Sequence, residues 1–262
     1  MKNELVVILP AYNEEQNVEK LVLNWQRGRK KLQERHGLKL HIVIVNDGST
    51  DQTEEISSQL TQRFSNVTLL NHDYNQGLGA AVKTGLTYAA ECPECAFACL
   101  MDCDNTQNPK YVLSMLRKIG RTAQEEDLSP MLYDVVIASR YRRGSKVQGV
   151  AGHRLLTSEG ARLVYTLILG VKGVRDYTCG YRLYTQDILQ RGLEQYGDEL
   201  VSETGFTCMA EVLYKLYLCG ARFGEVPFEL RYDYKEGASK MKVCKTAWDS
   251  IRLAFRLRIF KK

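Results

Sequence analysis

The sequence predicts an α/β domain with a mostly parallel central sheet and helices on both faces. Three observations lead to this prediction: short apolar runs alternate with amphipathic stretches in the first half, the runs have strand length, and most of them end in polar clusters or glycine-containing turns. Such alternation builds right-handed βαβ units whose strands lie parallel in one sheet. At 262 residues the chain fits one large domain.

The elements of the first half follow from hydrophobic periodicity. The run at 5–9 is uninterrupted and predicts a buried strand, whereas apolar residues recur at helical spacing within 14–35. After the second run, Thr50 or Asp51 is placed to cap a helix. The pattern predicts strands at 5–9, 39–45, 67–70, 96–101 and 135–138, and helices at 14–35, 52–64 and 78–90.

The second half of the chain is less regular. It predicts helices at 152–169 and 206–219, and an extended segment at 222–232 that Pro227 interrupts. We expect one domain over 1–240, followed by a basic amphipathic helix over 241–262.

Composition indicates a soluble protein of the cytoplasm. Hydrophobic residues make up 44% and charged residues 26%, as is usual for folded globular chains, which argues against disorder. No run approaches 18 apolar residues, so we expect no membrane-spanning helix. The eight cysteines, including the Cys92/Cys95 pair, are interpreted as reduced and mostly structural thiols.

The C-terminal helix has two interpretations. Its apolar side chains recur at helical spacing, at Trp248, Ile251, Phe255 and Ile259, with Arg252, Arg256, Arg258 and Lys262 elsewhere on the wheel. Such a helix can lie on an anionic membrane surface, which would make the protein peripheral there. It can also pack against its own domain, and both interpretations stay open.

Carboxylates follow three of the predicted strands, where open parallel sheets bind their ligands. Asp102 and Asp104 end the fourth strand as a D-x-D pair, which can face a Mg²⁺ or Mn²⁺ ion and a nucleotide diphosphate. Asp47 ends the second strand, and Tyr12 and Glu14 follow the first, so these three could contact a nucleoside. The alternative for Asp47 is a turn that leads into a helix cap.

Two further segments near these strand ends have alternative interpretations. The loop at 75–79 could bring backbone amides to a phosphate, or could be a tight turn before a helix. The basic segment at 139–154 suits a phosphorylated acceptor, or is a solvated loop.

These motifs occur in an order that resembles a known enzyme family. They are Pro10-Ala11-Tyr12-Asn13-Glu14, Asn46-Asp47-Gly48-Ser49, Asn75-x-Gly77-x-Gly79, Asp102-x-Asp104, Ser139-Arg140-Tyr141 and Asp176-Tyr177-Thr178-Cys179-Gly180-Tyr181-Arg182. The set, which spans about 5 to 240, resembles the inverting family-2 glycosyltransferases with the GT-A fold, a nucleotide-diphospho-sugar transferase-like architecture. The dolichyl-phosphate mannosyltransferase and polyprenyl-phosphate glycosyltransferase group is the most similar.

The resemblance implies roles for individual residues. Asp104, Arg140 and Asp176 would form the catalytic set, and Asp102 and Asp104 would hold the metal. The donor would be bound by Pro10, Tyr12, Glu14, Val45, Asp47, Asp102, Cys103, Asp104, Arg231 and Lys240. The acceptor phosphate would be bound by Arg140, Arg154, Ser158 and Arg182. Two departures are that Thr106 stands where the family often has Gln or His, and that Arg231 lies farther from Lys240 than usual.

The implied function is metal-dependent, inverting transfer of a sugar from a GDP-mannose or UDP-glucose type of donor to a polyprenyl or dolichyl phosphate. A membrane surface and a membrane-protein partner are also expected, whereas nucleic acid is not. One alternative is a family-2 enzyme with a soluble or polysaccharide acceptor. A second alternative is a nucleotidyltransferase, but that class has a Gly-rich loop with Arg and Lys after the first strand, where this chain has Pro10-Ala11-Tyr12-Asn13-Glu14. A third is a non-catalytic nucleotide-sugar-binding protein, and the intact D-x-D pair argues against it.

Overall fold

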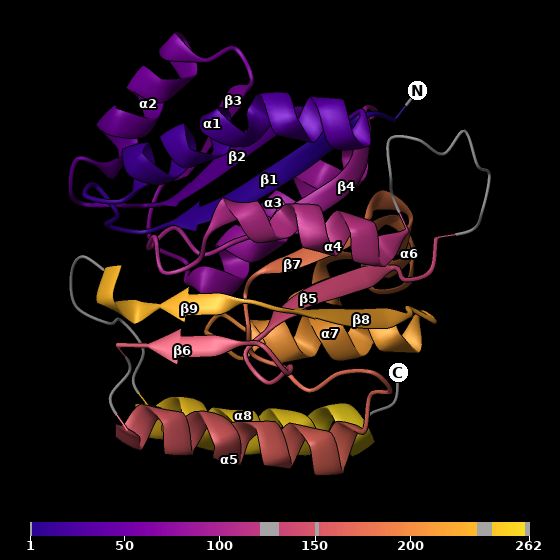
Figure 1. The fold of residues 1–262 in the computed structure, drawn as a ribbon. Coiled ribbons are helices and arrows are strands. Elements are labelled where there is room, and N and C mark those ends of the chain that lie inside the picture. Colours follow the sequence, from indigo (N-terminus) through magenta and orange to yellow (C-terminus); the bar gives the residue numbers. More distant parts are fainter. Residues whose placement is uncertain (1, 121–130, 150–151, 235–242, 260–262) are drawn as a thin grey trace.

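The computed structural model describes residues 2–120, 131–149, 152–234 and 243–259. Its core is a seven-stranded sheet in the order β3-β2-β1-β4-β7-β5-β8 (Figure 1). The strands of this sheet are β1 (Glu4–Ala11), β2 (Lys39–Asp47), β3 (Val67–His72), β4 (Cys95–Leu100), β5 (Val135–Ser139), β7 (Arg182–Thr185) and β8 (Phe223–Pro227). All neighbouring strands are parallel except β7, which is antiparallel to both β4 and β5. The mostly parallel sheet predicted from the sequence is therefore confirmed.

Helices cover both faces of the sheet, as predicted. Helix α3 (Leu78–Glu91) packs against α6 (Gln186–Tyr196) and α7 (Cys208–Leu218). Helix α1 (Val18–His36) packs against α2 (Thr53–Arg63). The helix α4 (Val112–Ile119) packs on β5 and β8. The predicted apolar run at 5–9 forms the centre of the core, where every side chain is fully buried.

A second, two-stranded sheet continues beyond the carboxyl ends of β5 and β8 (Figure 1). The short strands β6 (Lys146–Gln148) and β9 (Glu229–Arg231) pair in parallel, and the predicted extended segment at 222–232 is thus divided into β8 and β9. The helices α5 (Gly152–Leu169) and α8 (Val243–Ile259) lie side by side below this pair (Figure 1).

The C-terminal helix α8 has a buried face and an exposed apolar face, which the sequence alone does not distinguish. Its buried side chains are Ser250, Leu253, Ala254 and Leu257, whereas the predicted apolar stripe is exposed. The helix therefore packs on its own domain through one face and presents Trp248, Ile251, Phe255 and Ile259 on another. Over the described ranges, none of the helices has the length and apolar character needed to cross a membrane.

The register of the parallel strands brings the predicted site residues to one edge. Ala11 pairs with Asn46, and Asp47 pairs with His72, so β1, β2 and β3 end level with one another. The fourth strand, β4, ends on the same side at Leu100, two residues before Asp102. This carboxyl edge carries the candidate site.

Candidate active site

The loops that follow β1 and β2 are tied together by hydrogen bonds between side chains and backbone. Asn13 has a φ of 52°, in the left-handed region, and its side-chain oxygen accepts a hydrogen bond from the Thr50 N–H at 2.8 Å. The Asn13 N–H donates to Ser49 Oγ at 3.0 Å. These two bonds fix one rim of the site, which carries the half-buried side chains of Tyr12 and Glu14.

Asp47 is buried at the end of β2, and its carboxylate organises the loop between β3 and α3. It accepts hydrogen bonds from the backbone N–H groups of Gln76 at 3.0 Å and Gly77 at 2.8 Å. His72 Nδ1 lies 2.7 Å from the same carboxylate, and His72 Nε2 lies 2.9 Å from Thr84 Oγ1. Asp47 therefore fixes the backbone beside the predicted nucleoside contacts.

The loop at 75–79 is covered by the segment at 203–204. The Gly79 N–H donates to the carbonyl oxygen of Thr204 at 2.9 Å. A Cβ on Gly79 would lie only 1.8 Å from the carbonyl oxygen of Glu203, so no larger residue fits there. Because this amide already has a partner, the structure favours the tight-turn interpretation of the loop over the phosphate-binding one.

The D-x-D pair stands in a loop whose carboxylates are oriented by neighbouring polar side chains. Gln107 Nε2 donates to Asp102 Oδ2 at 2.6 Å, and Thr106 Oγ1 donates to Asp104 Oδ1 at 2.6 Å. Between the aspartates, Asn105 adopts a φ of 58°, and its side-chain amide donates to Asn17 Oδ1 at 3.0 Å. Thr106, which occupies the place of the family's Gln or His, thus contacts Asp104 directly.

Arg140, which follows β5, is held by the buried carboxylate of Asp176. Arg140 Nε donates to Asp176 Oδ2 at 2.8 Å, and Arg140 Nη2 donates to Asp176 Oδ1 at 2.6 Å, so the pair is bidentate. The same Nη2 also donates to Thr178 Oγ1 at 2.6 Å. About a fifth of the Arg140 side chain stays exposed, whereas Asp176 is fully buried (20% and 0%). The guanidinium is therefore fixed at the edge of the site, in a geometry that a lysine cannot reproduce.

The two charges shift each other's pKa. Burial by itself would raise the pKa of the Asp176 carboxyl, but the charge and the hydrogen bonds of Arg140 outweigh it and lower the pKa. Burial opposes the charge of Arg140, and Asp176 again outweighs it, so the pKa of Arg140 is raised. Burial raises the pKa of the nearby Cys179 thiol to about 12. The site therefore contains a permanent ion pair and a neutral thiol at physiological pH.

The segment at 176–182 links the arginine to the D-x-D loop. Asp176 and Thr178 hold Arg140 at one end, while Gly180 lies against Asp102 at the other. A Cβ on Gly180 would be 2.6 Å from Asp102 Oδ1, closer than a van der Waals contact permits. An alanine at this position would require the Asp102 carboxylate or the loop to shift, so this short segment couples the position of Arg140 to that of Asp102.

Glu225, on β8, holds the start of this loop through hydrogen bonds to its backbone. Its Oε1 accepts hydrogen bonds from the backbone N–H groups of Arg175 at 2.7 Å and Asp176 at 2.8 Å. Its Oε2 forms an ion pair with Arg142 Nε at 2.8 Å. Glu225 thereby anchors the segment that holds Arg140, and it pairs with one of the arginines of the basic segment.

Arg182 has a structural position instead of the predicted contact with an acceptor phosphate. It is fully buried in β7, and its guanidinium donates to three backbone carbonyl oxygens, those of Tyr177, Cys179 and Met209. These bonds hold the segment at 176–182 against α7. We therefore assign Arg182 to the support of the loop.

The remaining predicted residues are placed as follows. Arg231 lies on β9, and its backbone N–H donates to the carbonyl oxygen of Thr106 at 2.9 Å, which brings β9 to the D-x-D loop. Val45 and Cys103 are buried, and Pro10 is half-buried at the end of β1. Arg154 and Ser158 lie on α5, but their side chains are outside the described part of the chain, as is the whole of Lys240.

Sequence analysis missed the polar residues that orient the charged ones. Thr178 stands inside the motif at 176–182, so its contact with Arg140 could have been considered from the sequence. Glu225 offers a weaker signal, a single carboxylate in the apolar run at 223–226. Gln107 offers none, because only the folded loop brings its amide to Asp102.

Comparison with known proteins adds to this geometry. Residues 6–193 match the family described as Glycosyl transferase family 2. The chain is 27% identical to dolichyl-phosphate beta-glucosyltransferase ALG5A of Trichomonas vaginalis, over 97% of this chain and 74% of that protein. It is 29% identical to the dolichol-phosphate mannosyltransferase of Pyrococcus furiosus, over 96% of this chain and 62% of that protein.

Solved structures confirm the fold. The mannosyl-3-phosphoglycerate synthase of Rubrobacter xylanophilus superposes with a TM-score of 0.58, over 98% of this chain and 74% of that one, at 16% sequence identity. This similarity confirms the predicted GT-A type of architecture.

Proposed function

Because the chain belongs to glycosyl transferase family 2, we propose that it transfers a sugar from a nucleotide-diphosphate donor to a polyprenyl or dolichyl phosphate. The observation that carries the proposal is the loop at 176–182, which holds Arg140 at one end and meets Asp102 at the other. A fixed cation at the same sheet edge as a carboxylate pair suits a reaction between two phosphorylated substrates. The names of two relatives, a glucosyltransferase and a mannosyltransferase acting on dolichyl phosphate, support this class of acceptor.

We assign the donor to the carboxyl ends of β1, β2 and β4. On the rim that Asn13 fixes, Tyr12 and Glu14 would contact the nucleoside. The diphosphate would lie at the D-x-D loop, where β9 also brings Arg231. The full proposed donor set is Pro10, Tyr12, Glu14, Val45, Asp47, Asp102, Cys103, Asp104, Arg231 and Lys240.

The D-x-D loop fits a divalent metal. Both aspartates offer carboxylate oxygens, the ligands that Mg²⁺ and Mn²⁺ prefer, and each carboxylate is oriented by a hydrogen bond from Gln107 or Thr106. We propose that Asp102 and Asp104 hold a Mg²⁺ or Mn²⁺ ion. When bound, the ion would offset the negative charge that develops on the leaving diphosphate.

For the acceptor we propose contacts from Arg140, Arg154 and Ser158. A phosphate monoester is already an anion at neutral pH, so its attack on the anomeric carbon needs no strong general base. The phosphate oxygen forms the new bond to that carbon while the bond to the nucleoside diphosphate breaks, which inverts the configuration. Arg140 would position and neutralise the attacking phosphate, because Asp176 and Thr178 hold its guanidinium in place.

Substituting one metal-binding carboxylate tests the reaction class. We expect Asp104→Asn to lower sugar transfer about a hundredfold or more, because a bound metal supplies several kcal/mol of charge stabilisation. The measurement is product formation with a panel of GDP- and UDP-sugars, Mg²⁺ or Mn²⁺, and a short polyprenyl phosphate. It identifies the donor base and the sugar at the same time.

The same assay separates the alternatives. Transfer to a sugar or polysaccharide but not to the lipid phosphate would move the chain to the soluble-acceptor alternative. Transfer that persists at the wild-type rate in Asp104→Asn and in the presence of a chelator would overturn the metal assignment. Product of retained anomeric configuration, observed by NMR, would rule out single displacement.

We further propose that the protein is peripheral at the cytoplasmic face of a membrane, through α5 and α8. Both helices expose apolar side chains, which on α8 form a stripe that spans about 80° of the helical wheel. Arg252 and Arg258 are exposed and flank this stripe on its two sides. An apolar stripe with basic edges suits an anionic bilayer, since the arginines can reach the headgroups while the stripe is buried. The exposed apolar residues are Leu163, Leu167, Trp248, Ile251, Phe255 and Ile259.

Polar substitution on the stripe tests this surface. We expect Trp248→Ser combined with Phe255→Ser to weaken binding to anionic vesicles about tenfold or more, because each aromatic contributes about 1.5–3 kcal/mol when it leaves water. The measurement is vesicle co-sedimentation. Leu132→Ser is the matched control, because Leu132 is also exposed but lies outside both helices. Equal loss of binding in the control, or none in the double variant, would contradict the assignment.

A further inference from the structure

A cavity of about 530 Å³ lies at the amino edge of the sheet, opposite the edge that carries the D-x-D loop. Glu4 is the first residue of β1, and His41 lies near the start of β2. Cys92 follows the last residue of α3, in an extended conformation. The cavity is lined by Glu4, His41, Ser65, Asn66, Thr68, Tyr88, Glu91, Cys92, Pro93 and Glu94.

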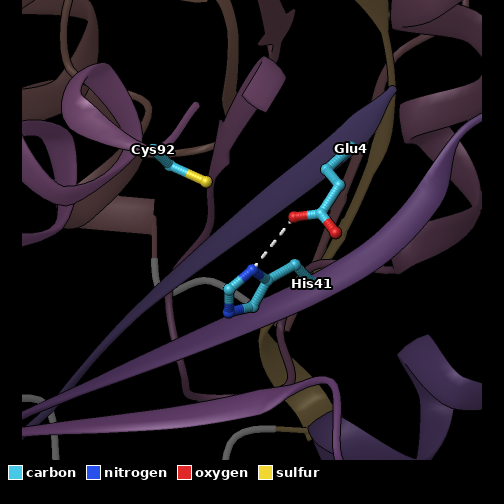
Figure 2. A group of neighbouring side chains, drawn as sticks. All are labelled: Glu4, His41 and Cys92. Atoms are coloured by element: carbon cyan, nitrogen blue, oxygen red, sulfur yellow. Dashed lines mark hydrogen bonds and ion pairs between the residues drawn. The ribbon is translucent and has the colours of Figure 1, made fainter. Parts of the chain in front are cut away.

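Three of these side chains converge in the cavity. Glu4 Oε2 and His41 Nδ1 are 3.2 Å apart, and with the Cys92 sulfur the three ligand atoms all lie within 4.8 Å of one another (Figure 2). All three residues are half-buried, so they are accessible to an ion from solvent while being partly shielded from it. Carboxylate, imidazole and thiol are the three side-chain groups that commonly bind Zn²⁺.

We propose that Glu4, His41 and Cys92 bind a Zn²⁺ ion, with a fourth coordination position open to the cavity. With the usual Zn–N and Zn–O bond lengths, two ligands at a tetrahedral angle are about 3.4 Å apart. The observed distance of 3.2 Å between Glu4 Oε2 and His41 Nδ1 is close to that value. A zinc-bound sulfur would lie about 3.6 Å from the nitrogen and from the oxygen. A displacement of about 1.2 Å at most therefore completes the set.

Neighbouring groups already orient the imidazole. His41 Nε2 lies 3.0 Å from Thr68 Oγ1 and 3.4 Å from the Tyr88 hydroxyl. With Nδ1 on the metal, the Nε2–H donates to Thr68, which fixes the tautomer and the ring as partners of zinc-bound histidines do. The Tyr88 ring packs edge-on against the imidazole, with centroids 5.7 Å apart.

The ligand types distinguish this site from the D-x-D loop. Sulfur and nitrogen ligands select Zn²⁺ over Mg²⁺, whereas the two aspartates offer oxygen alone. Burial raises the pKa of the Cys92 thiol, so the metal-free thiol is protonated and its proton is released when the metal binds. The bound ion would join the amino ends of β1 and β2 to the end of α3. The ion would stabilise the sheet and would take no part in the transfer reaction, because the cavity lies at the opposite edge from the D-x-D loop.

Cobalt spectroscopy on the full chain tests the proposal. After treatment with a chelator, we expect one equivalent of Co²⁺ to produce a thiolate-to-metal charge-transfer band that Zn²⁺ abolishes by displacement. The band is expected to persist in Asp104→Asn and to disappear in Cys92→Ser. Cys219→Ser is the matched control, because Cys219 is also a half-buried free thiol but lies outside the cavity.

Two further variants address the remaining ligands. His41→Asn is expected to lose tight Zn²⁺ binding in competition with a chromophoric chelator. Thr68→Val is expected to keep the band but to bind Zn²⁺ roughly 10–100-fold more weakly, because it removes only the partner of the imidazole. Circular dichroism establishes that each variant is folded. Absence of the band in the wild-type chain, or its persistence in Cys92→Ser, would overturn the proposal and leave an ordinary Glu–His pair beside a thiol.

Discussion

Asp176→Asn is expected to destabilise the protein by about 3 kcal/mol and to lower sugar transfer about a hundredfold. The substitution removes the charge that compensates Arg140, and loss of one partner from a buried pair costs about 3–5 kcal/mol. For a chain of this size, 3 kcal/mol corresponds to a fall in Tm of about 6–12 °C. Transfer falls because the Arg140 guanidinium is no longer fixed, and misplacement by about 1 Å costs about a hundredfold in rate.

The acid limb of the stability curve gives a second measurement on the same pair. Because the pKa of folded Asp176 is below its ordinary value, its contribution is complete above the unfolded pKa of about 3.9. That contribution is lost as the pH falls through the lower, folded-state pKa. The Asn variant lacks this group, so its Tm is expected to differ most from wild type at neutral pH and to approach it in strong acid.

Two controls separate position from charge. Asp198→Asn removes an ion pair of 2.7 Å with Lys83, but this aspartate is 90% exposed, so Tm is expected to stay unchanged. Arg140→Lys keeps the positive charge but loses the bidentate geometry, so it is expected to lower transfer by more than it lowers Tm. If Asp176→Asn keeps the wild-type Tm and transfer rate, the Arg140–Asp176 pair contributes neither to stability nor to the reaction.

The positions of the functional strand ends could be predicted from the sequence because each apolar run stops at a polar cluster. The strand predicted at 39–45 extends to Asp47, and the one predicted at 96–101 ends at Leu100, two residues before Asp102. In a parallel sheet this is enough to place Asp47, Asp102 and Arg140 along one edge. The pattern therefore predicts which residues share the site, although not which of them contact one another.

Strand β7 could not be predicted, because its stability depends on tertiary partners. It has four residues and begins with Arg182, a charge that counts against a buried strand. In the folded chain three backbone carbonyls satisfy that guanidinium, and two of them lie in the preceding loop. The family resemblance implied that Arg182 contacts the acceptor phosphate, because these tertiary partners are not visible in the motif at 176–182. In the structure Arg182 supports the loop instead.

Gly180→Ala is expected to lower transfer about a hundredfold while the chain stays folded. The added methyl group would lie 2.6 Å from Asp102 Oδ1 and must displace either the carboxylate or the loop. Gln107 holds that carboxylate in place with a hydrogen bond of 2.6 Å, so it does not yield without cost. Overpacking of this kind destabilises by about 1–3 kcal/mol, whereas displacement of Asp102 disturbs the proposed metal ligands directly.

The metal dependence of the reaction distinguishes this effect from general destabilisation. If Asp102 binds the metal, Gly180→Ala raises the Mn²⁺ or Mg²⁺ concentration needed for half-maximal transfer, and excess metal restores part of the rate. Gly28→Ala is the matched control, because a Cβ there meets no atom within 4 Å and alanine favours the helix α1. An unchanged metal requirement in Gly180→Ala would mean that the close approach of Gly180 to Asp102 does not set the position of the carboxylate. The contact between the loop at 176–182 and the D-x-D loop would then contribute only to packing, and the position of Arg140 would depend on Asp176 and Thr178 alone.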